Sequence, residues 1–440
     1  MQPVAHHNYN IRRYGVLRRS RLWTPILFVV GLLLVSSVAW AQDGVVTVLG
    51  VWGGQELEAF QKVMQAFTEK TGIQVQFEGT RDLPTVLETR LQAGNPPDVA
   101  AIPGPGAMKQ YADRGALVDL SQYLDMDALA DDLGPAWIEL GSYADGFYGL
   151  MISADIKSLI WYRPDQFAAK GYEVPTTWAE LEALMDKMVA NGDTPWAIGV
   201  ESGAASGWPA TDWIEDIMLR TAGPQVYDQW VAHEISWTDP RVREAWEIFG
   251  KIVRNSDYVY GGAAAVLSTN FGDSVNDLFT DPPRAMMHRQ ASFITSFIRD
   301  ANPDVVIGED VSFFLFPPIK EEHGNPMLGA GDMLAQFNPD PEAVEFMKFM
   351  ATAEAQAIWV GELGKLGTNS KIDPAVYPDD LTRAMAEALA QAEIFRFDGS
   401  DSMPAAVGSG AFFEAPLMYV GGEDLDTVLE YLESVAQETY

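Results

Sequence analysis

The sequence predicts an α/β fold, because apolar strands alternate with amphipathic helices at the spacing of parallel strands joined by helical crossovers. Length and composition agree with a folded chain: 48% of the residues are hydrophobic, and 440 residues suffice for roughly two to three domains. No internal repeat or low-complexity linker shows where one domain ends.

The first α/β region begins with a continuous β-branched run, which is typical of a buried strand. A helix follows, in which apolar residues recur at helical spacing until Thr71-Gly72 ends it. Asp82 is in position to cap the second helix. The predicted strands are 45–51, 73–77 and 97–102, and the predicted helices are 55–70 and 82–94.

A second α/β region is predicted from about residue 155 to 320, and the tail after about 340 is mostly helical. Its predicted helices are 178–191, 212–221 and 240–254, its predicted strands are 197–200, 285–288 and 311–316, and the tail contains an Ala/Glu-rich helix at 380–393.

Residues 1–41 differ from the rest of the chain. Their only charges are five arginines, an apolar run covers 26–35, and Ala39 and Ala41 give the small-x-small pattern of a cleavage site. We interpret 1–41 as a secretory signal peptide that is cleaved after about Ala41. The alternative is an uncleaved membrane anchor over 22–40, against which Pro25 and the small residues argue.

The charge of the exported chain is strongly negative. The whole chain carries −33, and without the five leader arginines 24 basic residues face 62 acidic ones, a net charge of −38. That balance excludes a nucleic-acid partner. The absence of cysteine excludes disulfides, Cys-ligated metals, thiol nucleophiles and a lipoprotein anchor. With no later membrane-spanning segment, we expect a periplasmic protein without a stable membrane anchor.

Candidate ligand-binding residues follow the carboxyl ends of the predicted strands, where open parallel sheets bind ligands. Trp52, Gln55 and Glu56 follow the first strand, and Arg81 follows the second. Trp52 either contacts a ligand or packs in the core. Arg81 either clamps hydroxyl groups or belongs to a solvated pair with Asp82.

The segment 154–162 places two opposite charges beside a tryptophan. Read as a strand, it puts Asp155, Lys157 and Trp161 on one face, which suits a cleft wall for a polar, hydroxylated ring. The alternative is a buried ion pair that joins the strand to a helix.

A second group of candidates comes from loops. Glu201 ends a strand, and a cap at Thr211 leaves Trp208 on the open loop before a helix. Phe293 and the pair Phe412 and Phe413 are either stacking platforms or core residues.

Aromatic rings with acidic and basic side chains suit a sugar, whose C–H faces stack on rings and whose hydroxyls form hydrogen bonds. Catalysis is disfavoured, because neither G-x-S-x-G nor H-E-x-x-H occurs. The histidines after the leader are scattered, so we expect no metal site and no cofactor. A secreted carbohydrate-active enzyme is the alternative from another class.

The chain resembles the extracellular solute-binding proteins of ABC importers, in the sugar-binding group that includes maltose-binding protein, and most closely the α-glucoside-binding branch. The resemblance covers essentially the whole chain after the leader, in family order. It is carried by the following stretches: 51–53, 67–72, 93–99, 155–162, 207–216, 329–332 and 400–408.

The resemblance implies a type II periplasmic-binding-protein fold, with two α/β lobes, a hinge of several crossovers and the ligand cleft between the lobes. It implies a first lobe of 42–154 plus 326–365 and a second of 155–325 plus 366–440. One departure stands out: 103–106 reads Pro-Gly-Pro-Gly where maltose binders carry an aromatic residue.

Together, the residues and the resemblance predict a monomeric receptor that binds an α-glucoside or related di- or oligosaccharide and delivers it to an ABC permease. A polyol or another small solute is the alternative ligand. The predicted ligand-binding residues are Trp52, Gln55, Glu56, Arg81, Asp98, Asp155, Lys157, Trp161, Glu201, Trp208, Asp212, Phe293, Asp332, Phe412 and Phe413.

Overall fold

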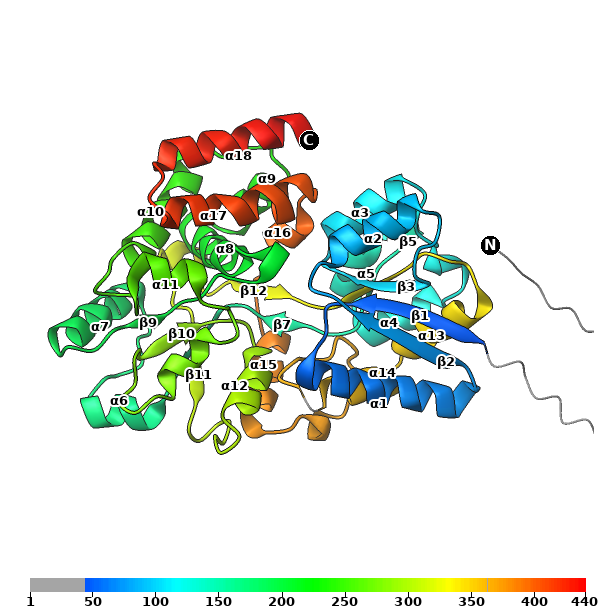
Figure 1. Cartoon of the computed structure of the whole chain (residues 1–440), viewed down its shortest axis with the longest axis horizontal. Helices are drawn as coiled ribbons and strands as arrows, with labels where there is room; N and C mark the ends of the chain where they lie inside the picture. Colours follow the sequence, from blue (N-terminus) through cyan, green and yellow to red (C-terminus); the bar gives the residue numbers. More distant parts are fainter. Residues whose placement is uncertain (1–43, 362) are drawn as a thin grey trace, which may run out of the picture. The chain divides into compact units, whose positions relative to one another are not determined.

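The alternation of strands and helices builds two α/β lobes in the computed structural model, which describes residues 44–361 and 363–440 (Figure 1). The leader predicted for residues 1–41 lies outside the described residues. Each lobe is formed around a sheet of its own, and a third, smaller sheet lies where the chain passes between them.

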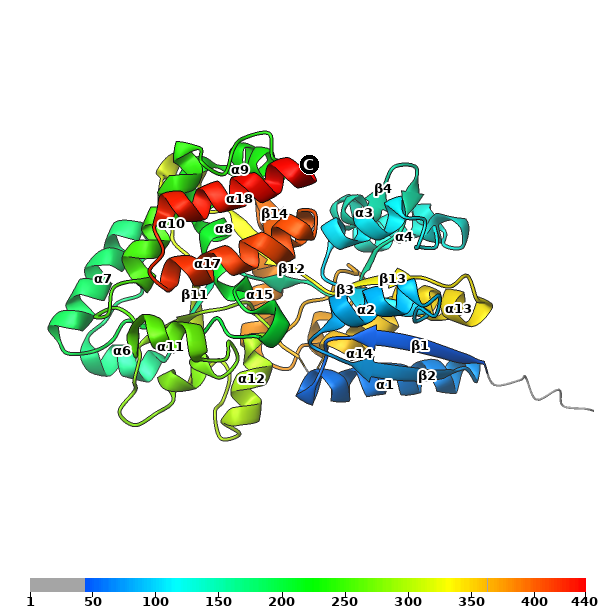
Figure 2. The same cartoon turned by 45° about the horizontal axis from the view of Figure 1, so that its top comes forward.

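The first lobe is formed around a five-stranded sheet of order β2-β1-β3-β13-β6. β1 runs parallel to β2 and β3, and β13 is antiparallel to β3. α1 and α14 pack on one face, and α2 and α3 on the other (Figures 1 and 2). The elements of this lobe are β1 (Val45–Gly50), α1 (Gly54–Thr71), β2 (Gln74–Gly79), α2 (Leu83–Gln92), β3 (Val99–Ile102), α3 (Pro105–Asp113), α4 (Met126–Leu133), α5 (Pro135–Gly141), β4 (Ser142–Tyr143), β5 (Gly146–Phe147), β6 (Leu150–Met151), β13 (Met333–Gln336), α13 (Pro341–Met350) and α14 (Ala353–Val360).

The second lobe is formed around a four-stranded sheet of order β11-β8-β10-β9, in which β8 is antiparallel to both neighbours. Its elements are β8 (Leu159–Tyr162), α6 (Pro164–Lys170), α7 (Trp178–Ala190), β9 (Trp196–Ala197), α8 (Trp208–Ala222), α9 (Pro224–Val231), α10 (Pro240–Val253), α11 (Gly262–Ser268), β10 (Met287–Arg289), α12 (Ile294–Ala301), β11 (Ser312–Leu315), α15 (Asp380–Ala390), α16 (Gly399–Ser402), α17 (Phe412–Val420) and α18 (Leu425–Thr439).

The third sheet forms the hinge, with the order β14-β12-β7. Its strands are β7 (Asp155–Ile156), β12 (Met327–Ala330) and β14 (Phe395–Phe397). An additional β-bridge joins Ala154 to Leu366. Chain segments far apart in sequence therefore pair where the lobes meet, while the exact lobe boundaries given above stay a prediction.

The predicted strands of the first region and most predicted helices are present within a few residues of their expected bounds, because local apolar periodicity defines them. Two local predictions are wrong. Residues 154–162 form two strands in different sheets instead of one, since the chain leaves the hinge sheet after β7 and enters the second-lobe sheet at β8.

The second wrong prediction concerns the start of α8. The helix begins at Trp208, and its N-cap is Gly207 in a left-handed conformation with φ 106°. Thr211 lies inside the helix, and its hydroxyl donates a hydrogen bond to the carbonyl oxygen of Trp208. Across the described part of the chain, no helix combines the length and the apolar character that a bilayer crossing requires.

Candidate functional site

A cavity of about 240 Å³ lies between the lobes. On the first-lobe side, Val51 follows β1, Arg81 follows β2 and Pro103 follows β3. This wall therefore stands at the carboxyl ends of parallel strands, where open α/β sheets bind ligands.

The opposite wall comes from the second lobe and the hinge. Its aromatic residues are Trp208 at the start of α8 and Phe413 in α17, and Asp401 of α16 adds a carboxyl group. Lys157 and Asp332, which follow the hinge strands β7 and β12, complete it. The remaining lining residues are Leu83, Pro84, Ala101, Ile102, Ser202, Ala205, Gly331, Asp398, Ser400 and Ser409.

The lobes touch each other beside this cavity. A Cβ atom on Gly106 would lie 1.9 Å from the carbonyl oxygen of Met403, and one on Gly104 would lie 3.0 Å from the Cβ of Asp401. Glycine is therefore required at 106 for this approach, and a side chain at 104 would be tightly crowded. This close approach gives the departure at 103–106 a physical reason. Arg81 also reaches the second lobe, with its guanidinium carbon 5.7 Å from the Phe271 ring centroid.

A buried group of charges, which we call the hinge cluster, consists of Lys365, Glu56, Asp155 and Asp332. The ammonium nitrogen of Lys365 lies 2.8 Å from Asp332, 3.1 Å from Glu56 and 3.8 Å from Asp155. Burial raises the pKa of Asp155 to about 7, although Lys365 opposes the rise. Burial also opposes ionisation of Asp332, but its close contact with Lys365 holds its pKa below the ordinary value.

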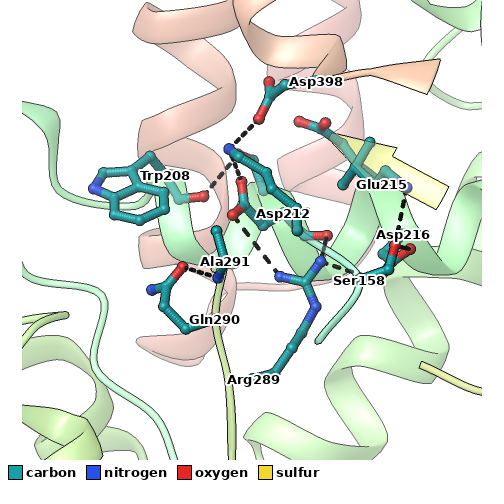
Figure 3. A network of polar contacts seen from close by, with 12 residues as sticks. Ser158, Trp208, Asp212, Glu215, Asp216, Arg289, Gln290, Ala291 and Asp398 are labelled. Atoms are coloured by element: carbon teal, nitrogen blue, oxygen red, sulfur yellow. Dashed lines mark hydrogen bonds and ion pairs between the residues drawn. The ribbon is translucent and has the colours of Figure 1, made fainter. Parts of the chain in front are cut away.

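A second buried network lies behind Trp208 (Figure 3). The ammonium nitrogen of Lys157 is 2.7 Å from Asp212 Oδ1 and also pairs with Asp398. Arg289 lies 3.1 Å from Asp216 and 3.8 Å from Asp212. Arg220 also pairs with Asp216 and completes the network. We call these six residues the wall cluster: Lys157, Arg220, Arg289, Asp212, Asp216 and Asp398.

The wall cluster holds three cations and three carboxyl groups in ion-pair contact, all of them nearly inaccessible to solvent. Burial raises the pKa of Asp212 to about 7 even though Lys157 and Arg289 oppose the rise. Asp398 behaves differently: burial opposes its ionisation, but Lys157 and hydrogen bonds from Ser400 and the Asp401 backbone N–H hold its pKa below the ordinary value.

The structure brings five of the predicted site residues to the cavity surface: Arg81, Lys157, Trp208, Asp332 and Phe413. Glu56, Asp155 and Asp212 lie behind that surface in the two clusters. Gln55 is partly buried in α1, outside the lining. Ligand contact by these residues stays a prediction.

Glu201 and Phe293 flank the cavity without lining it. The Glu201 carboxylate accepts hydrogen bonds from Asn270 Nδ2 (2.8 Å) and the Gly203 N–H (2.7 Å), and these bonds lower its pKa. The Phe293 ring packs against Trp208, with 6.0 Å between centroids. Both residues are therefore placed to support Trp208 or the loop before it.

Two predicted ligand-binding residues are core residues, and the prediction for them is wrong. Trp161 is completely buried, and its indole N–H donates to the carbonyl oxygen of Gln290 at 2.8 Å. Phe412 is also completely buried, in contact with Trp230 and Trp237. Neither side chain reaches the cavity: Trp161 packs beside Phe313 of β11 in a core cluster shared with the first lobe, and Phe412 packs in the second-lobe core.

Trp52 and Asp98 are corrected as well. Trp52 is 2% exposed and packs on Phe77, and its indole N–H donates to Asp332 (3.1 Å), so it supports the hinge cluster from behind. Asp98 precedes β3, at the end of the sheet opposite the cavity. Its carboxylate accepts hydrogen bonds from Thr47 and Asn338, which is a structural role.

Sequence reasoning missed the second-lobe residues Asp398, Ser400 and Asp401, as well as Phe271 and Lys365. A usable indication was present for the first three, since Asp398 directly follows β14, a strand parallel to β12. Nothing comparable in the sequence pointed to Phe271 or Lys365.

Comparison with known proteins places this geometry in a family. Residues 53–357 match the model of the bacterial extracellular solute-binding proteins. The osmoprotective compounds-binding protein GgtB of Synechocystis sp. is 45% identical over 388 residues, which cover 88% of this chain and 91% of that protein. The alpha-glucosides-binding periplasmic protein AglE of Rhizobium meliloti is 42% identical over 388 residues, covering 86% and 83%.

Solved structures show the same fold. A chitin oligosaccharide binding protein superposes with a TM-score of 0.78 at 21% identity, over 90% of this chain and 99% of its own. The binding protein RafE in complex with raffinose gives 0.72 at 19% identity, over 90% and 99%. These structures share the fold, and the family match together with the two relatives above 40% identity gives the assignment: the chain belongs to the bacterial extracellular solute-binding protein family.

Proposed function

We propose that this protein is the sugar-binding receptor of an ABC importer, which binds an α-glucoside or a related short saccharide and delivers it to the permease. The observation that carries the proposal is the interlobe cavity, which combines the Trp208 ring with the charged side chains of Arg81, Lys157 and Asp332. A sugar requires an aromatic ring that stacks on its C–H face and polar groups that form hydrogen bonds with its hydroxyls. The relative at 42% identity that is named for alpha-glucosides supports the same ligand class.

The size of the cavity favours a short ligand. Its volume of about 240 Å³ lies below the roughly 300–1,000 Å³ of pockets for drug-sized molecules. We therefore expect a di- or small oligosaccharide whose central ring or rings occupy the cavity. A larger groove of about 980 Å³ lies between α3, α5 and α9 and contains none of the predicted site residues.

The mechanism is conformational. A ligand held by Arg81 on one lobe and Trp208 on the other favours the arrangement in which the lobes touch, because only that arrangement provides both contacts. The contact of Gly104 and Gly106 with 401–403 forms in the same arrangement. The permease then recognises the closed form, and no covalent step is required.

The setting of this function follows from the same proposal. The receptor is exported by its leader, cleaved after about Ala41, and acts in the periplasm as a monomer without a membrane anchor. Its carboxyl groups support binding rather than hydrolysis, since Asp332 and Asp398 are each tied to a lysine, whereas a glycosidase needs two carboxyl groups free to act on the bond.

Titration with maltose, trehalose, sucrose and glucose tests the proposal, with tryptophan fluorescence and hydrolysis followed together. Saturable binding without turnover is expected for at least one disaccharide. Trp208→Ala should weaken that binding about tenfold or more, because a stacking ring at the centre of the site is lost. The matched control is Trp178→Ala, a partly buried tryptophan of the same lobe that stacks on Phe316 outside the cavity. Equal losses in both variants, or turnover by the wild type, would contradict the proposal.

A further inference from the structure

The cavity wall contains more carboxyl groups than its cations can neutralise. The three cations of the wall cluster already face its three carboxyl groups. Two further carboxyl groups, of Glu215 and Asp401, adjoin this cluster without a salt bridge in the part of the chain that the structure describes. The two differ in what surrounds them.

Glu215 is fully enclosed by protein. It accepts hydrogen bonds from the backbone N–H of Gly399 (2.7 Å) and of Ser400 (3.1 Å), and the Tyr227 hydroxyl lies 3.1 Å from it. Its side chain is therefore satisfied, and it holds the start of α16 in place behind the cavity wall.

Asp401 lies two residues after Gly399, whose N–H is held by Glu215, and it lines the cavity. Its backbone N–H donates to Asp398 Oδ1 at 2.8 Å, which fixes the turn. Its carboxyl group has neither a side-chain hydrogen bond nor an ion pair among residues 44–361 and 363–440. Asp401 is partly buried and faces the cavity, so its carboxyl group is free to pair with whatever occupies that cavity.

We propose that Asp401 binds the ligand as a neutral carboxylic acid that donates a hydrogen bond to a ligand oxygen, so that the site selects uncharged, hydroxyl-bearing ligands over cationic ones. This inference rests on the proposed sugar-binding function and adds a residue with a defined protonation state to it. A neutral acid donates through its O–H and accepts through its carbonyl oxygen, as a hydroxyl group of a sugar does.

The surrounding charges keep this group neutral. Lys157 is already shared by Asp212 and Asp398, and a third carboxylate beside them would be repelled. Burial, reinforced by Asp398 and opposed by Lys157, raises the pKa of Asp401 well above its ordinary value. α3, packed on the other side, contributes no titratable group at 104–106. The other charged or titratable groups that surround the cavity near Asp401 are Arg81, Asp332, Glu215 and Tyr227.

The decisive experiment compares wild type with Asp401→Asn and Asp401→Ala in the full chain, with the disaccharide that binds best in the titration above. Dissociation constants are measured by calorimetry from pH 5.5 to pH 9. In the wild type, affinity should fall by up to about tenfold per pH unit once the pH exceeds the pKa of Asp401. Asp401→Asn keeps a donor and an acceptor, so we expect near-wild-type affinity and a flatter pH profile. Asp401→Ala should bind about three- to tenfold more weakly than Asp401→Asn at every pH, because alanine supplies neither donor nor acceptor.

A ligand-free readout separates this inference from the proposed function. The infrared difference between wild type and Asp401→Asn at pH 7 should contain the carbonyl band of a protonated carboxyl group, whether or not any sugar binds. Failure of every saccharide to bind would overturn the proposed function. A carboxylate band instead, or Asp401→Asn losing as much affinity as Asp401→Ala, would overturn the inference. The inference would also be overturned if the protein bound the cationic glucosamine more tightly than glucose and if this preference disappeared in the Asp401 variants.

Discussion

The two walls of the cavity differ in the way they hold charge. The first-lobe wall presents strand ends and apolar side chains, with Arg81 as its charged residue within the lining. The second-lobe wall presents Lys157, Asp398 and Asp401, and the buried wall cluster stands behind them. The comparison teaches that the second lobe combines the polar part of the cavity lining with buried ion pairs, whereas the first lobe contributes mainly an apolar surface.

Removal of the central cation of the second-lobe wall should have the largest effect. Lys157→Met leaves Asp212 and Asp398 buried without their shared partner. We expect the free energy of unfolding in urea to fall by about 3–5 kcal/mol, which is typical when one partner of a buried ion pair is removed.

The matched control for Lys157→Met is Lys348→Met. This lysine pairs with Glu345 on the surface of the first lobe, where both side chains are about half exposed (43% and 51%), and such pairs contribute roughly 0–1 kcal/mol. A small effect of Lys157→Met, similar to that of the control, would show that the wall cluster does not stabilise the second lobe and would remove the contrast between the walls.

The contrast between the walls also explains which parts of the fold and the site can be predicted from the sequence. The first-lobe strands and helices follow from local periodicity, and Arg81 follows from the strand-end rule. The second-lobe wall is assembled from distant segments: Lys157 and Asp398 are 241 residues apart. No local pattern indicates such a pairing. The alternation along 154–162 misplaces Trp161, because the chain changes sheets between β7 and β8.

The hinge cluster joins the two walls, and its excess of acid predicts a pH dependence of stability. Asp155 has a pKa near 7 in the folded protein, raised from 3.8 by burial. The folded state thus holds a proton that the unfolded state releases between about pH 4 and 7, so stability falls as the pH rises through that window. Between pH 5 and pH 8, we expect Asp155 to account for a loss of about 2.5 kcal/mol.

Asp155→Asn should reduce this slope, because the amide does not titrate while its oxygen still accepts the hydrogen bond from Ser292. Urea unfolding at pH 5 and pH 8 measures the difference. Part of the slope should remain, since Asp212 titrates near pH 7 as well. Asp145→Asn, at an exposed turn of the first lobe, is the control and should leave the slope unchanged. An equal change of slope in both variants would show that the overall negative charge, rather than the buried cluster, sets the pH dependence.

The smallest expected effect concerns closure of the first-lobe wall. Gly106→Ala adds a methyl group where the carbonyl oxygen of Met403 lies 1.9 Å away, and backbone atoms cannot yield cheaply. We expect sugar affinity to fall about tenfold, or about 1.4 kcal/mol, because the touching arrangement is disfavoured. Stability in urea without sugar should be unchanged or slightly higher, since alanine suits α3 better than glycine. Gly53→Ala, whose new Cβ would meet no atom within 4 Å, should not change affinity. If Gly106→Ala lost stability as well as affinity, this residue would contribute to the folding of the first lobe and not only to its closure, and the contrast between the two walls would be contradicted.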